Sequence, residues 1–276
     1  MIREIINEVR EAIQEAFTYS LHTNSGSFVL FLARGDYDHR FEGDQFAHLE
    51  PKPSPYCLDY MLNSYRDETR DNFYIRYLNR RYKNDDFKYQ GDDGIDDLCV
   101  EMMIYSHVWE SDAFLKHLYR LSNIVSGKEF YDWDVSSIKF HGHHLIMETK
   151  ERFKVSCPKL YKIIDASYTG YIRDSFAHSL FNVDEDARII ELYSDRVKNN
   201  LNLSRLSFDE FQAKFLYTVE LCYELSRMLH ETRKALIKDW ELLSKPIPLP
   251  DGKILSITDA ELLHGEPRFR ATIYVK

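Results

Sequence analysis

The longest helical pattern in the sequence runs from Ser207 to about Asp239, and it limits the fold more than any other feature. Ser207 and Glu210 form an S-x-x-E capping box, whose side chains satisfy free backbone N–H groups at the start of a helix. Pro246 prevents much continuation. The pattern therefore predicts one long amphipathic helix. Its apolar stripe comprises Phe211, Phe215, Val219, Cys222, Leu225 and Leu229.

Helical signals dominate the rest of the chain as well. Residues 2–19 carry apolar side chains at helical spacing, and residues 95–125 predict a further helix that ends at Gly127. Residues 160–180 predict another helix, which follows Pro158. The chain contains no internal repeat and no low-complexity tract.

Short strands are predicted at a few places. Residues 28–32 have the pattern of a short strand or a turn of buried chain. Residues 181–190 predict a β-hairpin with its turn near residues 184–186. The fold class is therefore mainly α, with a hairpin after the helix of residues 160–180 and small β additions at the C-terminus. Those additions are two short strands, residues 254–258 and 271–275.

Composition indicates a globular protein with a sizeable core. The chain has 276 residues, of which 44% are hydrophobic and 14% aromatic. No window approaches the roughly 18 consecutive apolar residues of a membrane span, and the charged N-terminus lacks a signal-peptide core, which predicts a cytoplasmic protein without a membrane partner. The four cysteines form no CxxC pair. The net charge of −9 means that any contact with nucleic acid needs local basic patches.

Several cofactor and metal sites lack their sequence support. His141, His143 and His144 in the FHGHH stretch are candidate metal ligands, but no carboxylate or cysteine stands at a matching spacing. The acidic loops lack the ligand order of a calcium loop. Phosphate-loop, dinucleotide-binding and hydrolase-elbow motifs are absent from the sequence. We therefore expect neither a metal nor a cofactor.

Arginines alternate with tyrosines in residues 65–83. Charge for phosphates and ring faces for bases are what single-stranded RNA requires, so this segment is a candidate RNA-binding surface. The alternative is an amphipathic helix whose tyrosines pack and whose arginines pair with neighbouring acidic residues. The RNA-binding candidates are Arg66, Arg70, Arg76, Arg80 and Tyr77.

The stretch YIRDSFAHSLF places Arg173, Asp174 and His178 on an aromatic background. The R-x4-H spacing occurs twice; the other instance, Arg34 with His39, lies in a loop rich in glycine and aspartate. On a straight helix, residues five apart point about 140° away from each other, whereas residues four apart share a face. Asp174 is therefore expected to orient the His178 imidazole, and both Arg173 and His178 are expected to face a solvent-filled cleft.

This stretch resembles the motif of HEPN domains, in which an arginine, a polar residue and a histidine stand near the end of a helix in an up-and-down four-helix bundle. The resemblance covers roughly residues 93–241. The motif, the hairpin after it and the following long helix look like those of the HEPN members found in bacterial toxins and antiphage systems. It implies an N-terminal helical or mixed extension over residues 1–92, a HEPN-like bundle over residues 93–243 and a short-strand tail over residues 244–276.

The resemblance implies a metal-independent endoribonuclease that acts as a homodimer. The RNA 2′-hydroxyl would attack the phosphorus, Arg173 would bind the phosphate and His178 would act as acid or base. One motif supplies a single histidine, whereas two motifs in a twofold dimer supply both an acid and a base. A toxin or abortive-infection effector would have RNA as substrate and an antitoxin or regulatory protein as partner.

Two alternatives stay open. A HEPN-like module without catalytic activity would bind RNA, a nucleotide or a partner protein, and its motif would be buried in packing or would lack a dimer cleft. An unrelated helical protein would use Arg173 and Asp174 for capping and pairing and would bury His178 with a satisfied hydrogen bond.

Overall fold

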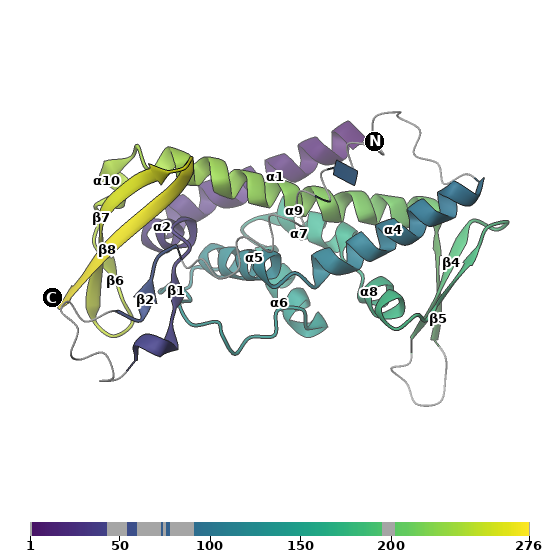
Figure 1. Ribbon diagram of the computed structural model, residues 1–276, viewed down its shortest axis with the longest axis horizontal. Helices are drawn as coiled ribbons and strands as arrows, with labels where there is room; N and C mark the ends of the chain where they lie inside the picture. Colours follow the sequence, from purple (N-terminus) through teal and green to yellow (C-terminus); the bar gives the residue numbers. More distant parts are fainter. Residues whose placement is uncertain are drawn as a thin grey trace.

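The fold is mainly helical, as predicted, and it also contains small antiparallel sheets (Figure 1). Within the described part of the chain, the helices form an elongated body, with the C-terminal strands at one end and a second small sheet at the other (Figure 1). Among the described residues, no helix is both long enough and hydrophobic enough to cross a bilayer. The computed structural model describes residues 2–42, 54–59, 73, 76, 77, 91–194 and 202–275.

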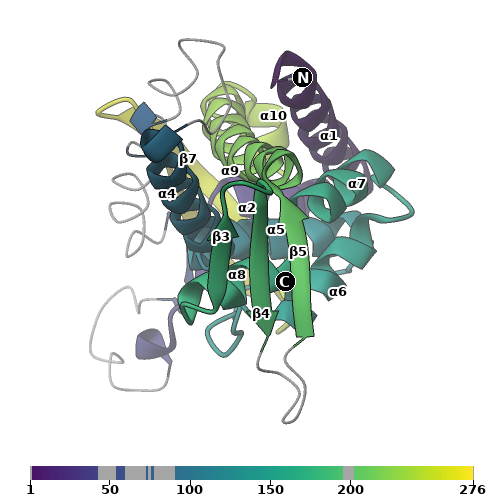
Figure 2. The same cartoon turned by 90° about the vertical axis from the view of Figure 1, so that its right-hand side faces the viewer.

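The longest helix, α9 (Phe208–Leu236), runs along most of the length of the molecule and starts at the predicted capping box. The Glu210 backbone N–H donates to Ser207 Oγ at 3.2 Å, and the Ser207 N–H donates to the Glu210 carboxylate at 2.8 Å. The predicted apolar stripe is buried along its whole length. It packs in one core with α1 (Ile2–Thr23) and α7 (Pro158–Ser167), which lie beside α9 in both views (Figures 1 and 2).

The single helix predicted over residues 95–125 is wrong, because the chain turns between α4 (Gly91–Trp109) and α5 (Asp112–Val125). Ser111 separates the two helices: its backbone is extended, and its side chain accepts a backbone N–H from the first turn of α5. Apolar residues continue at helical spacing on both sides of this serine, so the apolar pattern does not reveal the break between α4 and α5. Gly127 follows α5 with a φ of 79°, as expected for a glycine that ends a helix.

The helix predicted over residues 160–180 is also divided, into α7 and α8 (Gly170–Ala177). The backbone is extended at Thr169, the residue before α8. The buried hydroxyl of Tyr105, on α4, fixes this junction, because it donates to the Ser167 carbonyl at 2.9 Å and accepts the Thr169 N–H at 2.7 Å. The break gives α8 its own direction, separate from that of α7.

The strand or turn predicted over residues 28–32 is wrong, since these residues belong to the helix α2 (Ser25–Leu32). Asn24 caps this helix by accepting the Ser27 N–H at 2.9 Å. All residues from Ser27 to Leu32 are buried. A helix that is buried on every side has no polar face, so its sequence shows an uninterrupted apolar run that is indistinguishable from a buried strand.

The predicted hairpin after α8 is confirmed and gains a third strand. Strand β3 (Phe181–Asp184) pairs antiparallel with β4 (Ile189–Ser194), and β4 pairs with β5 (Asn202–Ser207), which leads directly into α9. Figure 2 shows this sheet facing the viewer, with α8 behind it and α9 above it. The sheet thereby fixes where the C-terminal end of α8 lies.

The two strands predicted at the C-terminus are confirmed, and both are longer than expected. Strand β7 (Lys253–Leu263) pairs with β8 (Glu266–Val275), and the short strand β6 (Ile247–Pro248) pairs with β7. This sheet lies beside α2 and the C-terminal end of α9.

The predicted division of the chain at residues 92 and 243 stays a prediction. Helix α1 packs against α9 and α7, and α2 packs against α5, so the N-terminal helices contribute to the same core as the central segment. The remaining elements are short: β1 (Asp36–Tyr37), η1 (His39–Phe41), β2 (Tyr56–Cys57), α6 (His143–Phe153) and α10 (Trp240–Leu243).

Candidate functional site

Helix α8 carries the three candidate catalytic residues and is held from two sides. Its buried Ile172 lies in the apolar core, and the helix packs against α4. On the other side, Ser175 Oγ donates to the Tyr193 carbonyl of β4 at 3.0 Å. The α8 backbone is therefore fixed to both the helical core and the β3–β4–β5 sheet.

Arg173 lies on the buried side of α8, where its side chain is 10% exposed. Its Nε and Nη2 donate to Asp174 Oδ1 at 3.2 and 2.8 Å, and its Nη1 donates to the His141 backbone carbonyl. The expectation that this side chain faces a solvent-filled cleft is wrong, because the loop that precedes α6 covers it.

His178 lies at the C-terminal cap of α8 and is exposed. The helix ends in a Schellman arrangement: the Leu180 N–H donates to the Ser175 carbonyl at 2.7 Å, and the Ser179 N–H donates to the Phe176 carbonyl at 3.1 Å. Ser179 has a φ of 55°, a left-handed conformation that turns the chain away from the helix axis. The imidazole thus stands at the surface, where the chain leaves α8 for β3.

The Asp174 carboxylate accepts hydrogen bonds from Arg173. The expected contact between this carboxylate and the His178 imidazole does not occur among the described residues. The two residues meet through the backbone, where the His178 N–H donates to the Asp174 carbonyl at 3.2 Å. The structure therefore brings Arg173 and Asp174 together and places His178 one helical turn further on, in solvent.

The FHGHH stretch lies against the N-terminal half of α8. His143 Nδ1 is 3.0 Å from the Tyr168 hydroxyl, and the two rings stack at 5.6 Å between centroids. A Cβ on Gly170 would stand 2.9 Å from His143 Nδ1, so a larger residue at the start of α8 would displace the His143 ring. This contact leaves no local pattern in the sequence, because the FHGHH stretch and α8 are far apart along the chain.

The three histidines do not gather around one point that could hold a metal. His141 Nδ1 lies 3.8 Å from Asp112 Oδ1, His143 contacts Tyr168, and His144 is exposed. Among the residues that the structure describes, no group of three or more histidine, cysteine, aspartate or glutamate side chains is arranged as a metal site.

The candidate RNA-binding segment is described at only two of its named residues. Arg76 is exposed. Tyr77 is 5% exposed, and its hydroxyl contacts Asp97 Oδ1 at 3.1 Å, so this ring packs in the core and is not available for stacking on a base. Tyr77 thus follows the alternative of a packed tyrosine. The other candidates, Arg66, Arg70 and Arg80, lie outside the described residues.

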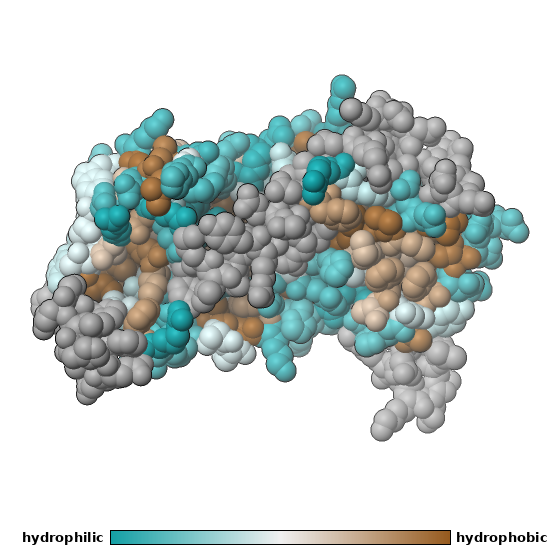
Figure 3. Space-filling view, viewed as in Figure 1, coloured by the Kyte–Doolittle hydropathy of each residue, from teal (hydrophilic) through white to brown (hydrophobic). Residues whose placement is uncertain are grey.

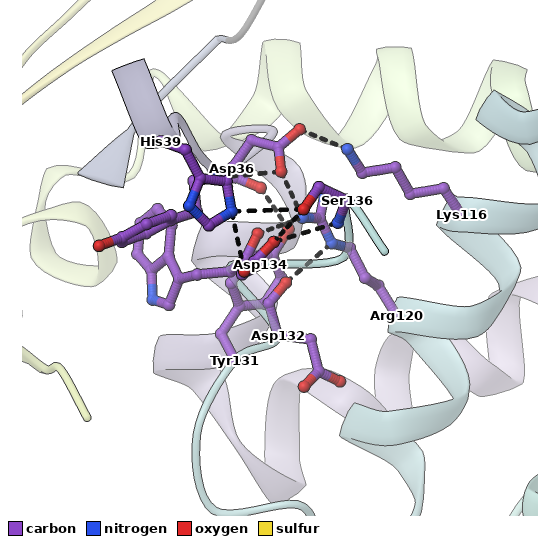
Figure 4. Close-up of polar contacts among 11 residues, drawn as sticks. Asp36, His39, Lys116, Arg120, Tyr131, Asp132, Asp134 and Ser136 are labelled. Atoms are coloured by element: carbon purple, nitrogen blue, oxygen red, sulfur yellow. Dashed lines mark hydrogen bonds and ion pairs between the residues drawn. The ribbon is translucent and has the colours of Figure 1, made fainter. Parts of the chain in front are cut away.

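The second R-x4-H pair, Arg34 and His39, forms no joint site either. Figure 4 shows His39 directed at Asp134 and Ser136, at distances of 3.0 and 3.3 Å from its Nε2. Its Nδ1 lies 3.3 Å from Glu42 Oε2. The hydrogen bonds to Glu42 and Asp134 raise the pKa of His39. A histidine between two carboxylates favours the imidazolium, which suits an ion pair better than proton abstraction.

No family model, no curated protein and no solved structure matches the chain. The interpretation of α8 therefore depends on the chemistry and geometry of its own residues.

Proposed function

We propose that the protein is a metal-independent endoribonuclease of the HEPN type, in which the RNA 2′-hydroxyl attacks the adjacent phosphorus. The observation that carries the proposal is the arrangement at α8: an exposed His178 at the end of the helix, preceded by an anchored Arg173 and followed by the β3–β4 hairpin.

His178 has the exposure that a proton-transfer residue needs. An imidazole ordinarily titrates near pH 6.5, so it can remove or deliver a proton close to neutral pH. Because His178 caps α8 and the sheet fixes the chain after it, the backbone that carries the imidazole has a defined position at the surface. An RNA strand can reach it without any rearrangement of the helical core.

Arg173 retains donors for a phosphate although it is largely buried. A guanidinium has five N–H groups. The described bonds use one N–H each on Nε, Nη1 and Nη2, which leaves one N–H on each terminal nitrogen. Asp174 and the His141 carbonyl hold the guanidinium plane in place, so the two remaining N–H groups would meet a phosphate oxygen in a fixed orientation.

A composite site in a homodimer would supply the second proton-transfer group. One α8 contributes one histidine, and a twofold axis beside α8 would add the partner's histidine. Figure 3 shows a hydrophobic surface over α4, the helix that packs against α8. Half-buried apolar side chains of α4 include Ile95 and Val100. An apolar surface next to the motif supports self-association there.

The biological role that we propose is that of a toxin or antiphage effector in the cytoplasm, with RNA as substrate and an antitoxin or regulatory protein as partner. This part of the proposal rests on the similarity of the motif, hairpin and long helix to HEPN members of that kind.

One observation favours a different function. The burial of Arg173 and its bonds within the chain are what a HEPN-like module without catalytic activity would show, since such a module uses the motif for packing. That protein would bind RNA, a nucleotide or a partner protein and would not cut RNA.

Cleavage assays with chelator distinguish these functions. We expect the purified protein to cut single-stranded RNA in excess EDTA and to leave a 2′,3′-cyclic phosphate, because side chains fill the proposed roles. An RNA with a 2′-deoxy nucleotide at the cleavage position should resist. Cleavage that is lost in EDTA and restored by zinc or manganese would contradict the metal-independent mechanism.

A further inference from the structure

An unusual arginine ends α2 at the other end of the molecule. Arg34 has a φ of 50°, within a Schellman arrangement in which its N–H donates to the Phe31 carbonyl at 3.2 Å and the Gly35 N–H donates to the Leu30 carbonyl at 2.9 Å. Glycine is the usual residue at this left-handed position, because a Cβ there carries a conformational cost. An arginine at this place therefore carries that conformational cost.

Within the described part of the chain, no acidic side chain forms an ion pair with the Arg34 guanidinium. It is half-buried, and no hydrogen bond or ion pair joins it to any described residue. Burial, together with the positive charge of Arg233, lowers the pKa of Arg34 to about 10. A guanidinium removed from water without an acceptor is unfavourable, and a bound anion would compensate for this loss.

The nearby acidic groups are already engaged by other partners. Asp59 Oδ1 accepts Arg233 Nη2 at 2.5 Å, and its Oδ2 accepts the Phe269 N–H at 2.6 Å. Glu266 Oε2 lies 3.6 Å from His230 Nδ1. Asp59 and Glu266 therefore reduce the positive potential at Arg34 without binding its donors.

Helices α5 and α9 add further positive charge behind Arg34. Arg233, on α9, is 1% exposed, and its buried Nε has no acceptor among the described residues. On α5, Lys116 and Arg120 share the single carboxylate of Asp36, as Figure 4 shows. Among the described residues of this region, cations thus outnumber carboxylates, although the chain as a whole has a net charge of −9.

His117, between those two cations on α5, shows the same imbalance. Burial and the positive charges of Arg34 and Arg120 lower its pKa well below the usual range. Its Nδ1 is buried without a partner within the described part of the chain. The neutral form of His117 is therefore favoured, which is the expected effect of burial beside several positive charges.

We propose that Arg34 binds the phosphate group of a small ligand, with Arg233 and the α5 cations providing the surrounding positive potential. A guanidinium fork matches two phosphate oxygens, and a phosphate carries enough charge to offset the local excess of cations. Because Arg34 is half-buried and Arg233 fully buried, a terminal phosphate fits this place better than the backbone of a polymer. The site lies at the opposite end of the molecule from α8 (Figure 1), so it is separate from the proposed nuclease site.

Thermal unfolding with inorganic phosphate tests this proposal. At a phosphate concentration about 100-fold above its dissociation constant, the melting temperature should rise by roughly 5 °C relative to chloride at matched ionic strength. The Arg34→Gly protein should lose this shift, and without phosphate it should melt no lower than wild type, because glycine adopts a positive φ without strain.

Arg188→Gly is the matched control, since Arg188 also has a left-handed backbone, with a φ of 53°, and lies in the hairpin turn before β4. Its phosphate shift should equal that of wild type. An absent wild-type shift, or a full shift in Arg34→Gly, would overturn the proposal. Tighter binding of an RNA oligonucleotide without terminal phosphates than of inorganic phosphate, lost in Arg34→Gly, would also overturn it, because the site would then bind a polymer backbone.

Discussion

Arg173 and Asp174, neighbours in sequence, form an ion pair with each other, with Arg173 Nη2 at 2.8 Å from Asp174 Oδ1. Consecutive residues on a helix point in different directions, so such a pair forms only because the long arginine side chain folds back along α8. This ion pair occupies the Asp174 carboxylate, which the four-residue spacing had predicted would contact His178. Asp174 therefore acts on the proposed chemistry through the arginine.

This pair predicts different effects for two substitutions. Arg173→Ala should lower cleavage by about 10²-fold and should also destabilise the protein by about 1–3 kcal/mol, since it leaves the His141 carbonyl and the Asp174 carboxylate without their donor. Asp174→Asn retains one acceptor and should cost roughly 10-fold in rate, with little change in stability. Cleavage rates and thermal melts of both proteins check this, and a larger loss in Asp174→Asn than in Arg173→Ala would contradict it.

Glu220, on α9, predicts a pH dependence of stability. Burial raises its pKa from the ordinary value of 4.5 to about 7, and the Glu224 carboxylate adds to the effect. In the unfolded chain the carboxyl ionises first, so the stability that the raised pKa provides is complete below pH 4.5 and is lost as the pH rises to about 7. Glu220→Gln should flatten this fall and should stabilise the protein at pH 8 by on the order of 1 kcal/mol.

Denaturant unfolding between pH 4 and pH 8 measures the Glu220 effect. The control is Glu185→Gln, because Glu185 is exposed in the turn between β3 and β4. It should keep the wild-type pH profile. An unchanged slope in Glu220→Gln would show that this carboxyl does not titrate in the predicted range.

The composite site predicts a homodimer at micromolar concentration. Light scattering should give about twice the chain mass of 32.8 kDa. Val100→Glu, on the half-buried side of α4, should shift the mass toward that of the monomer and should lower cleavage in parallel, because charge would be buried in the interface. A wild-type protein that is monomeric and still cuts RNA would contradict the composite site.

Local chemistry predicted much of the fold. The capping box at Ser207 and Glu210, the apolar stripe of α9, the hairpin after α8 and the C-terminal strands all depend on neighbouring residues, and each is present. The errors have a tertiary cause. Helix α2 is buried on every side and so shows no helical periodicity, and the break before α8 depends on the Tyr105 hydroxyl, which comes from another helix.

At the candidate site, too, only the features that depend on neighbouring residues could be predicted from the sequence. The exposure of His178 follows from its place at a helix end, which the sequence indicates. The burial of Arg173 does not follow from sequence, because its acceptor is a backbone carbonyl at His141, and a backbone acceptor leaves no trace in residue identity. The sequence signal for the break before α8 is Thr169 with Gly170, a β-branched residue and a glycine inside the predicted helix.

The cleavage rate of the His178→Ala protein tests the central claim most directly. His178 is exposed and caps α8 through its backbone, so alanine should leave the melting temperature nearly unchanged while cleavage falls by about 10²-fold or more. His22→Ala, at an exposed histidine of α1, should behave as wild type. Wild-type cleavage by a well-folded His178→Ala protein would contradict the account.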